Sequence, residues 1–199
     1  MECVNAFKYL GVKFTNNCKW ARQISDTIEK AKFSINQLSR FVRRYEDCDI
    51  LLNLRLFDAI VVPVLLYGSE IYAWAEGVKG YNSVAHMFYR KYLGLQQGTS
   101  GDVLELILGR ESIRSRAIRR ALIFWRRTIE KDERRLAKEA MEEQSRDLKN
   151  SRKNWLNNVE MELNKLGLSY LWMNPRRLGI KKFKKVLTCL LYTSDAADE

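Results

Sequence analysis

The chain of 199 residues is 46% hydrophobic and 30% charged, which excludes a disordered chain and predicts one or two globular domains with a real core. Two prolines and ten glycines favour long helices over a turn-rich β fold. The net charge of +11 and the pI near 9.6 are typical of nucleic-acid-binding proteins, but an ordinary solvated basic surface has the same totals.

The stretch FKYLGVKF at 7–14 has the clearest strand pattern of the chain. Its apolar residues alternate about a Leu10-Gly11 step, which predicts one short N-terminal β-strand or hairpin. These residues are Phe7, Tyr9, Val12 and Phe14. A strand cannot pair its own N–H and C=O groups, and almost everything downstream looks helical. We therefore expect this segment to have an exposed edge or to pair only with neighbouring residues.

Two helices are expected next. Apolar residues at steps of three and four predict the first, which Asn17 is placed to cap. Its apolar face comprises Trp20, Ile24, Ile28, Ala31, Ile35, Leu38 and Val42. The second helix, over 50–74 with Asp49 as its cap, is apolar on most sides and should therefore lie in the core. Pro63 is expected to kink it, and Gly68 to divide it into two segments.

The segments that follow are also predicted to be helical. Asn82 is placed to cap a helix that ends at Gly94, and a short helix is expected over 102–108. Apolar residues over 155–166 predict a further helix, which ends at Gly167.

A single long helix is predicted from Ser112 to about Gln144. At 100° per residue its basic side chains fall within one narrow stripe, broadly opposite an apolar side. The stripe contains Arg116, Arg120, Arg127, Lys131, Arg134 and Lys138. Cations on one line match the regular spacing of backbone phosphates, so the stripe is either a phosphate-tracking surface or a solvated helix face.

Common catalytic patterns are not found in the sequence. Gly-rich phosphate loops are absent, and the only histidine, His86, is expected to be a packing or surface residue. Four cysteines without C-x-x-C spacing argue against a zinc site and fit free thiols in a reducing, intracellular compartment, nucleus or cytoplasm. The most apolar run, 60–67, is too short to cross a bilayer, so no membrane partner is expected.

Three sequence blocks occur in an order that points to one family. FKYLGVKF at 7–14 comes first, and PVLLYGSEIYAW at 63–74 follows. YLGLQQGTSGDVLELILGRESI at 92–113 comes next, before RRALIFWRR at 119–127. These blocks resemble the reverse transcriptases of non-LTR (LINE-type) retrotransposons. In that family an F-x-Y-L-G element closes the palm domain, and a P-x-x-x-Y-G-x-E-x-W block lies in the thumb. Here Tyr72 stands where the family usually has Trp.

The resemblance implies a mainly α fold, a helical bundle of polymerase thumb and connection type with a strand or hairpin left from a truncated palm. The family's metal-binding aspartates, in an early palm motif and an A/V-D-D turn, lie before the Y-L-G element. The fragment is therefore expected to lack catalytic residues, metal sites and cofactors, whereas Mg²⁺ is expected for the full-length parent. Its implied partners are the template–primer duplex and the missing palm and fingers domains.

Five segments are expected along the chain. They are a last palm strand at 1–15, thumb helices at 16–76, post-thumb helices at 77–148, a C-terminal helical segment at 149–188 and a tail at 189–199. A polar linker is expected over 149–153, and a short basic helix or tail over 181–185. The end of the chain, CLLYTSDAADE, can be encoded by a transposase adapter used in sequencing libraries, so it is expected to be non-native.

The expected duplex contacts are basic residues of the first helix and of the long helix. They are Lys30, Arg40, Arg43, Arg44, Arg116, Arg120, Arg127 and Lys131. The residues implied to lie near the primer end, by resemblance only, are Tyr9, Leu10 and Gly11. The residues read as structural are Tyr67, Gly68 and Glu70, the last as a cap or buried partner.

Two alternatives to duplex binding stay open. The first is a helical protein–protein interaction module, in which the basic faces are solvated and the apolar second helix packs against a partner. The second is a sequence-specific DNA-binding helical domain, which is disfavoured because the sequence shows no compact helix-turn-helix.

Overall fold

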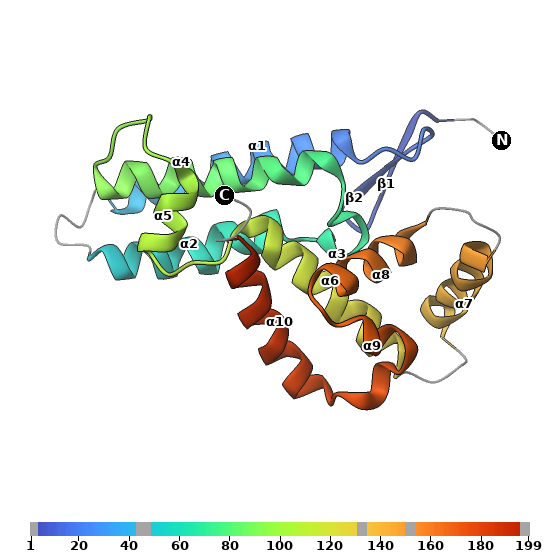
Figure 1. The fold of residues 1–199 in the computed structure, drawn as a ribbon. Coiled ribbons are helices and arrows are strands. Elements are labelled where there is room, and N and C mark those ends of the chain that lie inside the picture. Colours follow the sequence, from blue (N-terminus) through green and yellow to red (C-terminus); the bar gives the residue numbers. More distant parts are fainter. Residues whose placement is uncertain (1–3, 43–48, 131–134, 150–153, 196–199) are drawn as a thin grey trace. The chain divides into compact units, whose positions relative to one another are not determined.

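The computed structural model describes residues 4–42, 49–130, 135–149 and 154–195 (Figure 1). The chain forms two compact units, unit 1 (Met1–Arg116) and unit 2 (Ala117–Glu199). The described residues are mainly helical with one small antiparallel sheet, as the sequence predicts at this coarse level. The boundary between the units falls inside the predicted 77–148 segment, and the finer divisions expected from the sequence stay predictions.

The predicted N-terminal strand is a hairpin that pairs with itself. Strands β1 (Ala6–Tyr9) and β2 (Val12–Thr15) are antiparallel, and Phe7 lies opposite Phe14. The two residues of the turn, Leu10 and Gly11, have φ values of 45° and 84°. Positive φ at both central positions is the geometry of tight hairpin turns that match strand twist, and glycine adopts it without a Cβ penalty.

Unit 1 is built around helices α1 (Ala21–Val42), α2 (Ile50–Leu65) and α4 (Gly80–Leu93). Helix α1 contacts both α2 and α4, and its buried residues Ile24, Ala31, Ile35 and Leu38 belong to the predicted apolar face. Phe57 of α2 stacks on Phe88 of α4 with ring centroids 4.5 Å apart. The first two turns of α2 expose apolar side chains, so α2 is less buried than its composition predicts.

Shorter elements connect these helices in unit 1. The predicted break at Gly68 is confirmed, because α2 ends at Leu65 and α3 (Ser69–Tyr72) follows a left-handed Gly68. The 3₁₀ turn η1 (Glu76–Lys79) leads into α4, which ends at a left-handed Gly94 as predicted. The predicted short helix is α5 (Gly101–Ile107).

Two predicted helix caps are wrong. Helix α1 begins at Ala21, and Asn17 instead accepts a hydrogen bond from the Lys19 N–H in the preceding turn, at 3.0 Å. Helix α4 begins at Gly80, and the Asn82 side chain instead accepts from the N–H of Arg114, at 2.9 Å. Asn82 therefore satisfies a free N–H in the first turn of another helix, which local sequence pattern does not reveal.

The predicted long helix over 112–144 is also wrong. Helix α6 (Ile113–Ile129) ends fifteen residues early, and α7 (Leu136–Lys149) is a separate helix. The intervening sequence EKDERR at 130–135 contains no apolar residue. A helical segment without an apolar face gains nothing from packing, and short helices are marginal without it.

Unit 2 contains helix α6 from Ala117 onward, helix α7 and four further elements. They are α8 (Trp155–Lys165), α9 (Ser169–Met173), the 3₁₀ turn η2 (Pro175–Arg177) and α10 (Ile180–Asp195). Trp125 is buried and stacks on Trp172 at 5.9 Å between ring centroids. The predicted helix over 155–166 is confirmed, with Asn154 accepting from the Asn157 N–H and a left-handed Gly167 after its end.

Helix α10 contains both the predicted basic segment and part of the predicted tail. Phe183, Leu187 and Leu191 are buried at four-residue spacing, so the helical apolar pattern continues into 189–195. An acidic tail without an apolar pattern was the expectation from the sequence, and it is wrong up to Leu191. Its proposed origin in adapter DNA stays a prediction that resequencing of the locus tests.

Glycine substitutions should distinguish backbone strain from steric contact in unit 1. Gly68 and Gly94 have nearly equal φ values, 68° and 65°, but a Cβ on Gly68 would stand 2.9 Å from Val12 Cγ2, whereas one on Gly94 meets nothing within 4 Å. We expect Gly94→Ala to lower the free energy of unfolding by about 1 kcal/mol. Gly68→Ala should cost about 1–3 kcal/mol more, because Val12 is stiff and cannot move aside freely. Urea unfolding followed by circular dichroism measures both, and equal losses would contradict the close packing.

Candidate nucleic-acid interface

The hairpin turn is docked on the segment between α2 and α3. The Tyr67 hydroxyl donates a hydrogen bond of 2.6 Å to the Leu10 carbonyl. A Cβ on Gly11 would stand 3.1 Å from the Tyr67 ring, and Gly68 lies against Val12 in the same way. Two of the residue groups singled out in the sequence, Tyr9–Gly11 and Tyr67–Gly68, are therefore neighbours in space.

Aromatic contacts extend this docking into α1 and α3. Phe14 packs edge-on against Trp20 at 5.5 Å, and Trp20 packs against Tyr72 at 5.3 Å. The Tyr72 hydroxyl donates to the Tyr67 carbonyl at 2.8 Å, which closes a ring of contacts from hairpin to α3 and back. Glu70 lies half-buried in the first turn of α3, where an acidic side chain is favoured. Its predicted role as cap or buried partner stays a prediction.

One half of the hairpin face is open. Phe7, Tyr9, Val12 and Phe14 share a face, because paired residues and alternate residues of a strand point the same way. Val12 is only 7% exposed, whereas Phe7 and Tyr9 are 59% and 58% exposed. The helices of unit 1 thus bury Val12 of β2, whereas Phe14 of the same strand is 40% exposed and the apolar side chains of β1 stand in solvent.

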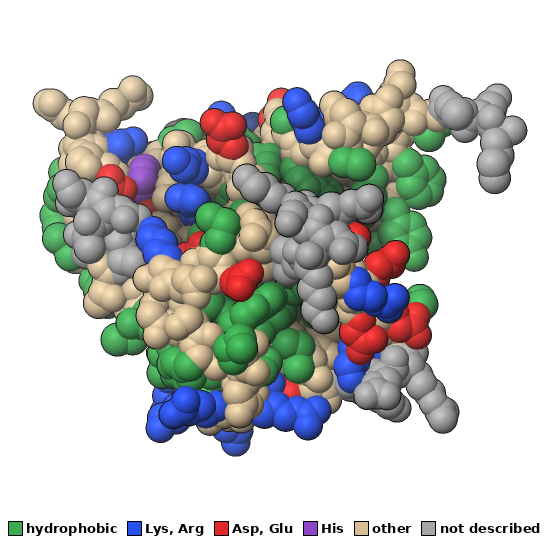
Figure 2. All heavy atoms as spheres, turned by 45° about the vertical axis from the view of Figure 1, so that its right-hand side comes forward, with side chains coloured by type: hydrophobic (Ala, Val, Ile, Leu, Met, Phe, Trp, Pro, Cys, Tyr) green, Lys and Arg blue, Asp and Glu red, His purple; other side chains and the backbone are tan. Residues whose placement is uncertain are grey.

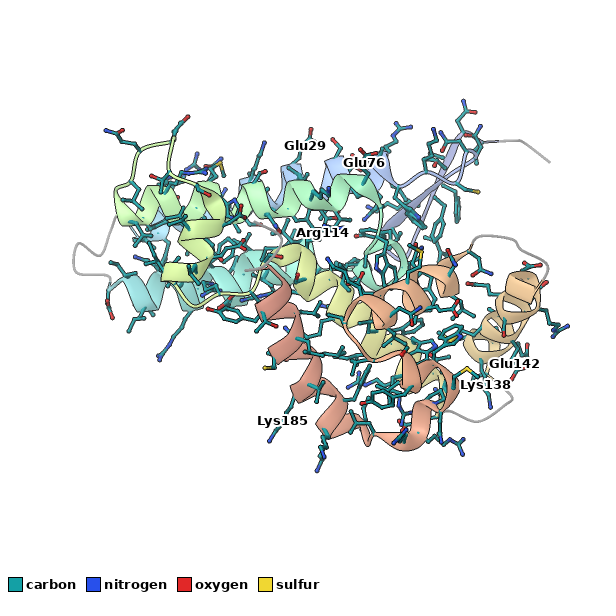
Figure 3. All side chains as sticks on the ribbon, in the orientation of Figure 1. Glu29, Glu76, Arg114, Lys138, Glu142 and Lys185 are labelled. Atoms are coloured by element: carbon teal, nitrogen blue, oxygen red, sulfur yellow. The ribbon has the colours of Figure 1, made fainter. Side chains whose placement is uncertain are left out.

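The basic residues expected on α1 lie on its solvent side. Lys30 and Arg40 are both exposed, and the predicted contacts Arg43 and Arg44 lie outside the described residues. The same side carries the exposed Glu29, labelled in Figure 3, and Asp26, which forms an ion pair with Lys13 of β2. The described part of this surface is therefore of mixed charge.

The predicted stripe does not form one line on one helix. Arg116, Arg120 and Arg127 lie on α6, Lys138 lies on α7, and Lys131 lies outside the described residues. Arg120 and Arg127 are exposed. Arg116 is half-buried with its Nη1 3.0 Å from Asp58 Oδ1, so its charge is already paired within unit 1.

Asp58 is shared between two arginines. Arg110 also forms an ion pair with Asp58, and its Nε donates to the Tyr89 hydroxyl at 3.0 Å. Burial acts to lower the pKa of Arg110, but the charges and hydrogen bonds of Tyr89 and Asp58 raise it above its ordinary value overall. Burial also raises the pKa of Tyr89, against the opposing effect of the Arg110 and Arg116 charges. This cluster stabilises unit 1 and removes two cations from the free surface.

Arg126 is a cation that the sequence analysis does not predict to be buried. It is 1% exposed, its Nη1 lies 2.7 Å from Glu130 Oε1, and its Nη2 donates to the Leu178 carbonyl at 3.2 Å. Neighbours Arg126 and Arg127 thus differ completely, one in the core of unit 2 and the other in solvent.

The densest exposed group of cations lies on η2 and the start of α10. This group, called here the α10 basic patch, comprises Arg176, Arg177, Lys181, Lys182 and Lys185. Phe183 is buried beneath it, which turns the flanking lysines outward. Lys185 is labelled in Figure 3, and Figure 2 shows Lys and Arg side chains gathered along the lower edge of unit 2. The stretch 175–194 contains no acidic residue.

The α10 basic patch was not among the predicted contacts, although its signal is visible in the sequence. RRLGIKKFKK at 176–185 has six cations in ten residues, and a single apolar residue among the lysines predicts a buried anchor. The lysines alone predict only a short basic helix or tail over 181–185, whereas the apolar residues Leu187 and Leu191 extend the helix beyond it.

Unit 2 also contains an apolar pocket of about 350 Å³. It is lined by the stacked Trp125 and Trp172 and by Met141, and the polar residues in its lining include Lys138 and Glu142 of α7 (Figure 3). Such walls suit a flat or aliphatic apolar group, with one side chain of each charge in the lining.

Comparison of the chain with protein-family models, with curated proteins and with solved structures gave no significant match. Within the described residues, none of the helices combines the length and apolarity that a bilayer crossing requires.

Charge reversal should separate the structural arginine of α6 from a surface one. Arg116→Glu places a second carboxylate against Asp58, so we expect the free energy of unfolding to fall by about 1–2 kcal/mol. Arg127→Glu, on the same helix but exposed, should change it by less than about 0.5 kcal/mol. Urea unfolding measures both variants. Equal stability of the two would show that the Asp58 ion pair contributes nothing.

Proposed function

We propose that the chain is the part of a non-LTR-type RNA-directed DNA polymerase that grips the template–primer duplex. The observation that supports this most is the docking of the hairpin turn on Tyr67 and Gly68. These residues belong to the first two of the blocks whose order resembles that family, and the two blocks begin 56 positions apart in the sequence. Their contact is what one continuous palm-to-thumb element requires.

The exposed cations suit phosphate contacts that do not depend on base sequence. The α10 basic patch offers five cations from one short stretch, and Arg120, Arg127, Lys30 and Arg40 add further exposed positive charge. Lys and Arg side chains bind phosphates through charge and fix the position of a protein on a duplex, whereas reading of sequence needs contacts to base edges. Arg116 is a weaker candidate because Asp58 already pairs with it.

The open face of β1 fits a fragment that belongs to a larger sheet. Phe7 and Tyr9 are exposed beside a strand that pairs on one side only within the described residues. The missing palm domain would cover this face and extend the sheet. The fingers and the Mg²⁺-binding aspartates of the parent would complete the polymerase, with Tyr9, Leu10 and Gly11 near the primer end.

Salt dependence of duplex binding is the direct test. A triple variant of the patch, Lys181→Glu, Lys182→Glu and Lys185→Glu, should bind a primer–template duplex more weakly, with a log–log salt slope smaller by about three, one per lost phosphate contact. The matched control changes exposed cations at three separate places, the loop before α1, α2 and η1, and alters net charge equally. Its substitutions are Lys19→Glu, Arg55→Glu and Lys79→Glu. Fluorescence anisotropy at several salt concentrations measures both.

The control separates a local surface from overall charge. Equal losses in the two triple variants would attribute binding to net charge alone and remove the patch from the interface. A wild-type chain that fails to bind duplex at low salt would overturn the proposed function for the fragment.

The fragment alone should not extend a primer. With Mg²⁺, deoxynucleotides and a primer–template that it binds, we expect no product above a protein-free blank, because the resemblance places the metal-binding aspartates outside the chain. A gel assay of labelled primer measures this. Clear extension by the purified chain would mean that it holds a catalytic site of its own.

A protein–protein interaction module is the second candidate. It is favoured by the apolar side chains that the first turns of α2 expose, Ile50, Leu51 and Leu52. Exposed apolar groups that are clustered mark binding surfaces more often than scattered ones do. If this alternative holds, Leu51→Lys will abolish binding of the protein partner. The affinity of the chain for duplex will then be no higher than that of a basic protein that binds nucleic acid only through its net charge.

A further inference from the structure

Three side chains in unit 1 converge between α4 and α5. His86 lies on α4, and its Nε2 is 2.7 Å from Glu105 Oε1 of α5. Asp102 precedes Glu105 by three residues, so both carboxylates lie on one side of α5. One ligand atom from each of the three residues lies within 4.8 Å of the other two. His86 is therefore a packing residue, as predicted, that also lies close to two carboxylates.

The charges of this cluster are not balanced by its own members. Glu105 is 6% exposed and His86 9% exposed, so a carboxylate and an imidazole share a site with little water. A second carboxylate, on Asp102, lies within reach of both. A single imidazole offsets at most one of the two negative charges, and like charges at short range disfavour each other. A divalent cation would neutralise both carboxylates.

The imidazole is held in place by the backbone of α5. A Cβ on Gly101 would stand 1.9 Å from Nδ1 and 2.1 Å from Cε1 of His86, so the ring occupies the space that any other residue would fill. Packing of one edge of the ring against the backbone leaves Nε2 directed at the carboxylate of Glu105. Such a fixed orientation favours metal binding, because the imidazole then loses little conformational entropy when the ion binds.

We propose that His86, Asp102 and Glu105 bind a divalent transition-metal ion of the Zn²⁺ class. One imidazole nitrogen and two carboxylate oxygens are donors that Zn²⁺ accepts at about 2.0–2.2 Å, and three protein ligands leave a fourth position for water. The exposed Asp102 rotates inward to complete the set, and His86 and Glu105 part slightly. The ion joins α5 to α4, independently of any nucleic acid. This assignment reverses the expectation of no metal, which rested on cysteine spacing and a lone histidine.

The experiment is a titration of the purified full chain, stripped with chelator, with Co²⁺ as a spectroscopic probe and Zn²⁺ as competitor. We expect one ion per chain, visible d–d absorption that Zn²⁺ abolishes, and a rise in the melting temperature on metal addition. The absorption should lack the intense near-ultraviolet band of a cobalt thiolate. Such a band would place the ion on cysteines, of which Cys18 and Cys189 are exposed free thiols, and would overturn the proposal.

Two variants of the proposed ligands and one control variant test where the ion binds. Asp102→Asn keeps the His86–Glu105 pair, so the metal-free melting temperature should hold. Metal affinity should fall more than about 100-fold, beyond the roughly 10–100-fold loss typical of a residue that only supports a ligand. His86→Gln should abolish the absorption. Glu29→Gln, an exposed acid on α1, is the matched control for one lost negative charge and should bind metal like the wild type. The proposal would be overturned if Asp102→Asn bound the metal with the affinity of the wild-type chain. It would also be overturned if the wild-type chain showed no saturable metal binding.

Discussion

The order of the N-terminal hairpin depends on its contact with the segment between α2 and α3. An isolated two-stranded hairpin is marginal in water, because it cannot bury enough apolar surface to offset the entropy lost on folding. Here the Tyr67 hydroxyl holds the turn through the Leu10 carbonyl, and Val12 fills the space over Gly68. The Lys13 N–H also donates to the Gln23 side chain of α1, at 2.8 Å. Each contact is small, but together they fix the turn and β2 to the helices of unit 1, and β1 is held through its pairing with β2.

That contact in turn constrains the backbone. Tyr67 reaches the hairpin only because the chain turns at a left-handed Gly68, and the turn also starts α3, which brings Tyr72 under Trp20. A side chain at residue 68 would both strain the backbone and displace Val12. The same glycine therefore follows the end of α2, leaves room for the hairpin and allows the aromatic packing of Phe14. This accounts for the glycine at residue 68 between two helices.

The parts of the fold that follow from local chemistry were predictable. Gly68, Gly94 and Gly167 end or divide helices because left-handed backbone favours glycine, whatever the tertiary context. The hairpin was expected as a strand or hairpin, and its alternation about Leu10-Gly11 is a local signal. The single long helix is wrong because the regular spacing of charges continues from 116 to 138, whereas α6 ends at Ile129 and α7 begins at Leu136. Regular spacing of polar residues alone does not show where a helix ends.

The candidate sites depend on contacts between distant residues, which is why sequence placed them only partly. Asn82 has the right chemistry for a cap but serves Arg114, and His86 meets Asp102 and Glu105 only because α5 folds back on α4. Charge shows the same limit. Arg110, Arg116 and Arg126 are held by Asp58 and Glu130, so three of the 35 Lys and Arg residues are used in folding. Any phosphate-binding surface must come from cations without such local partners, and acid-free sequence around a buried anchor, as at Phe183, is a better guide to them than total charge.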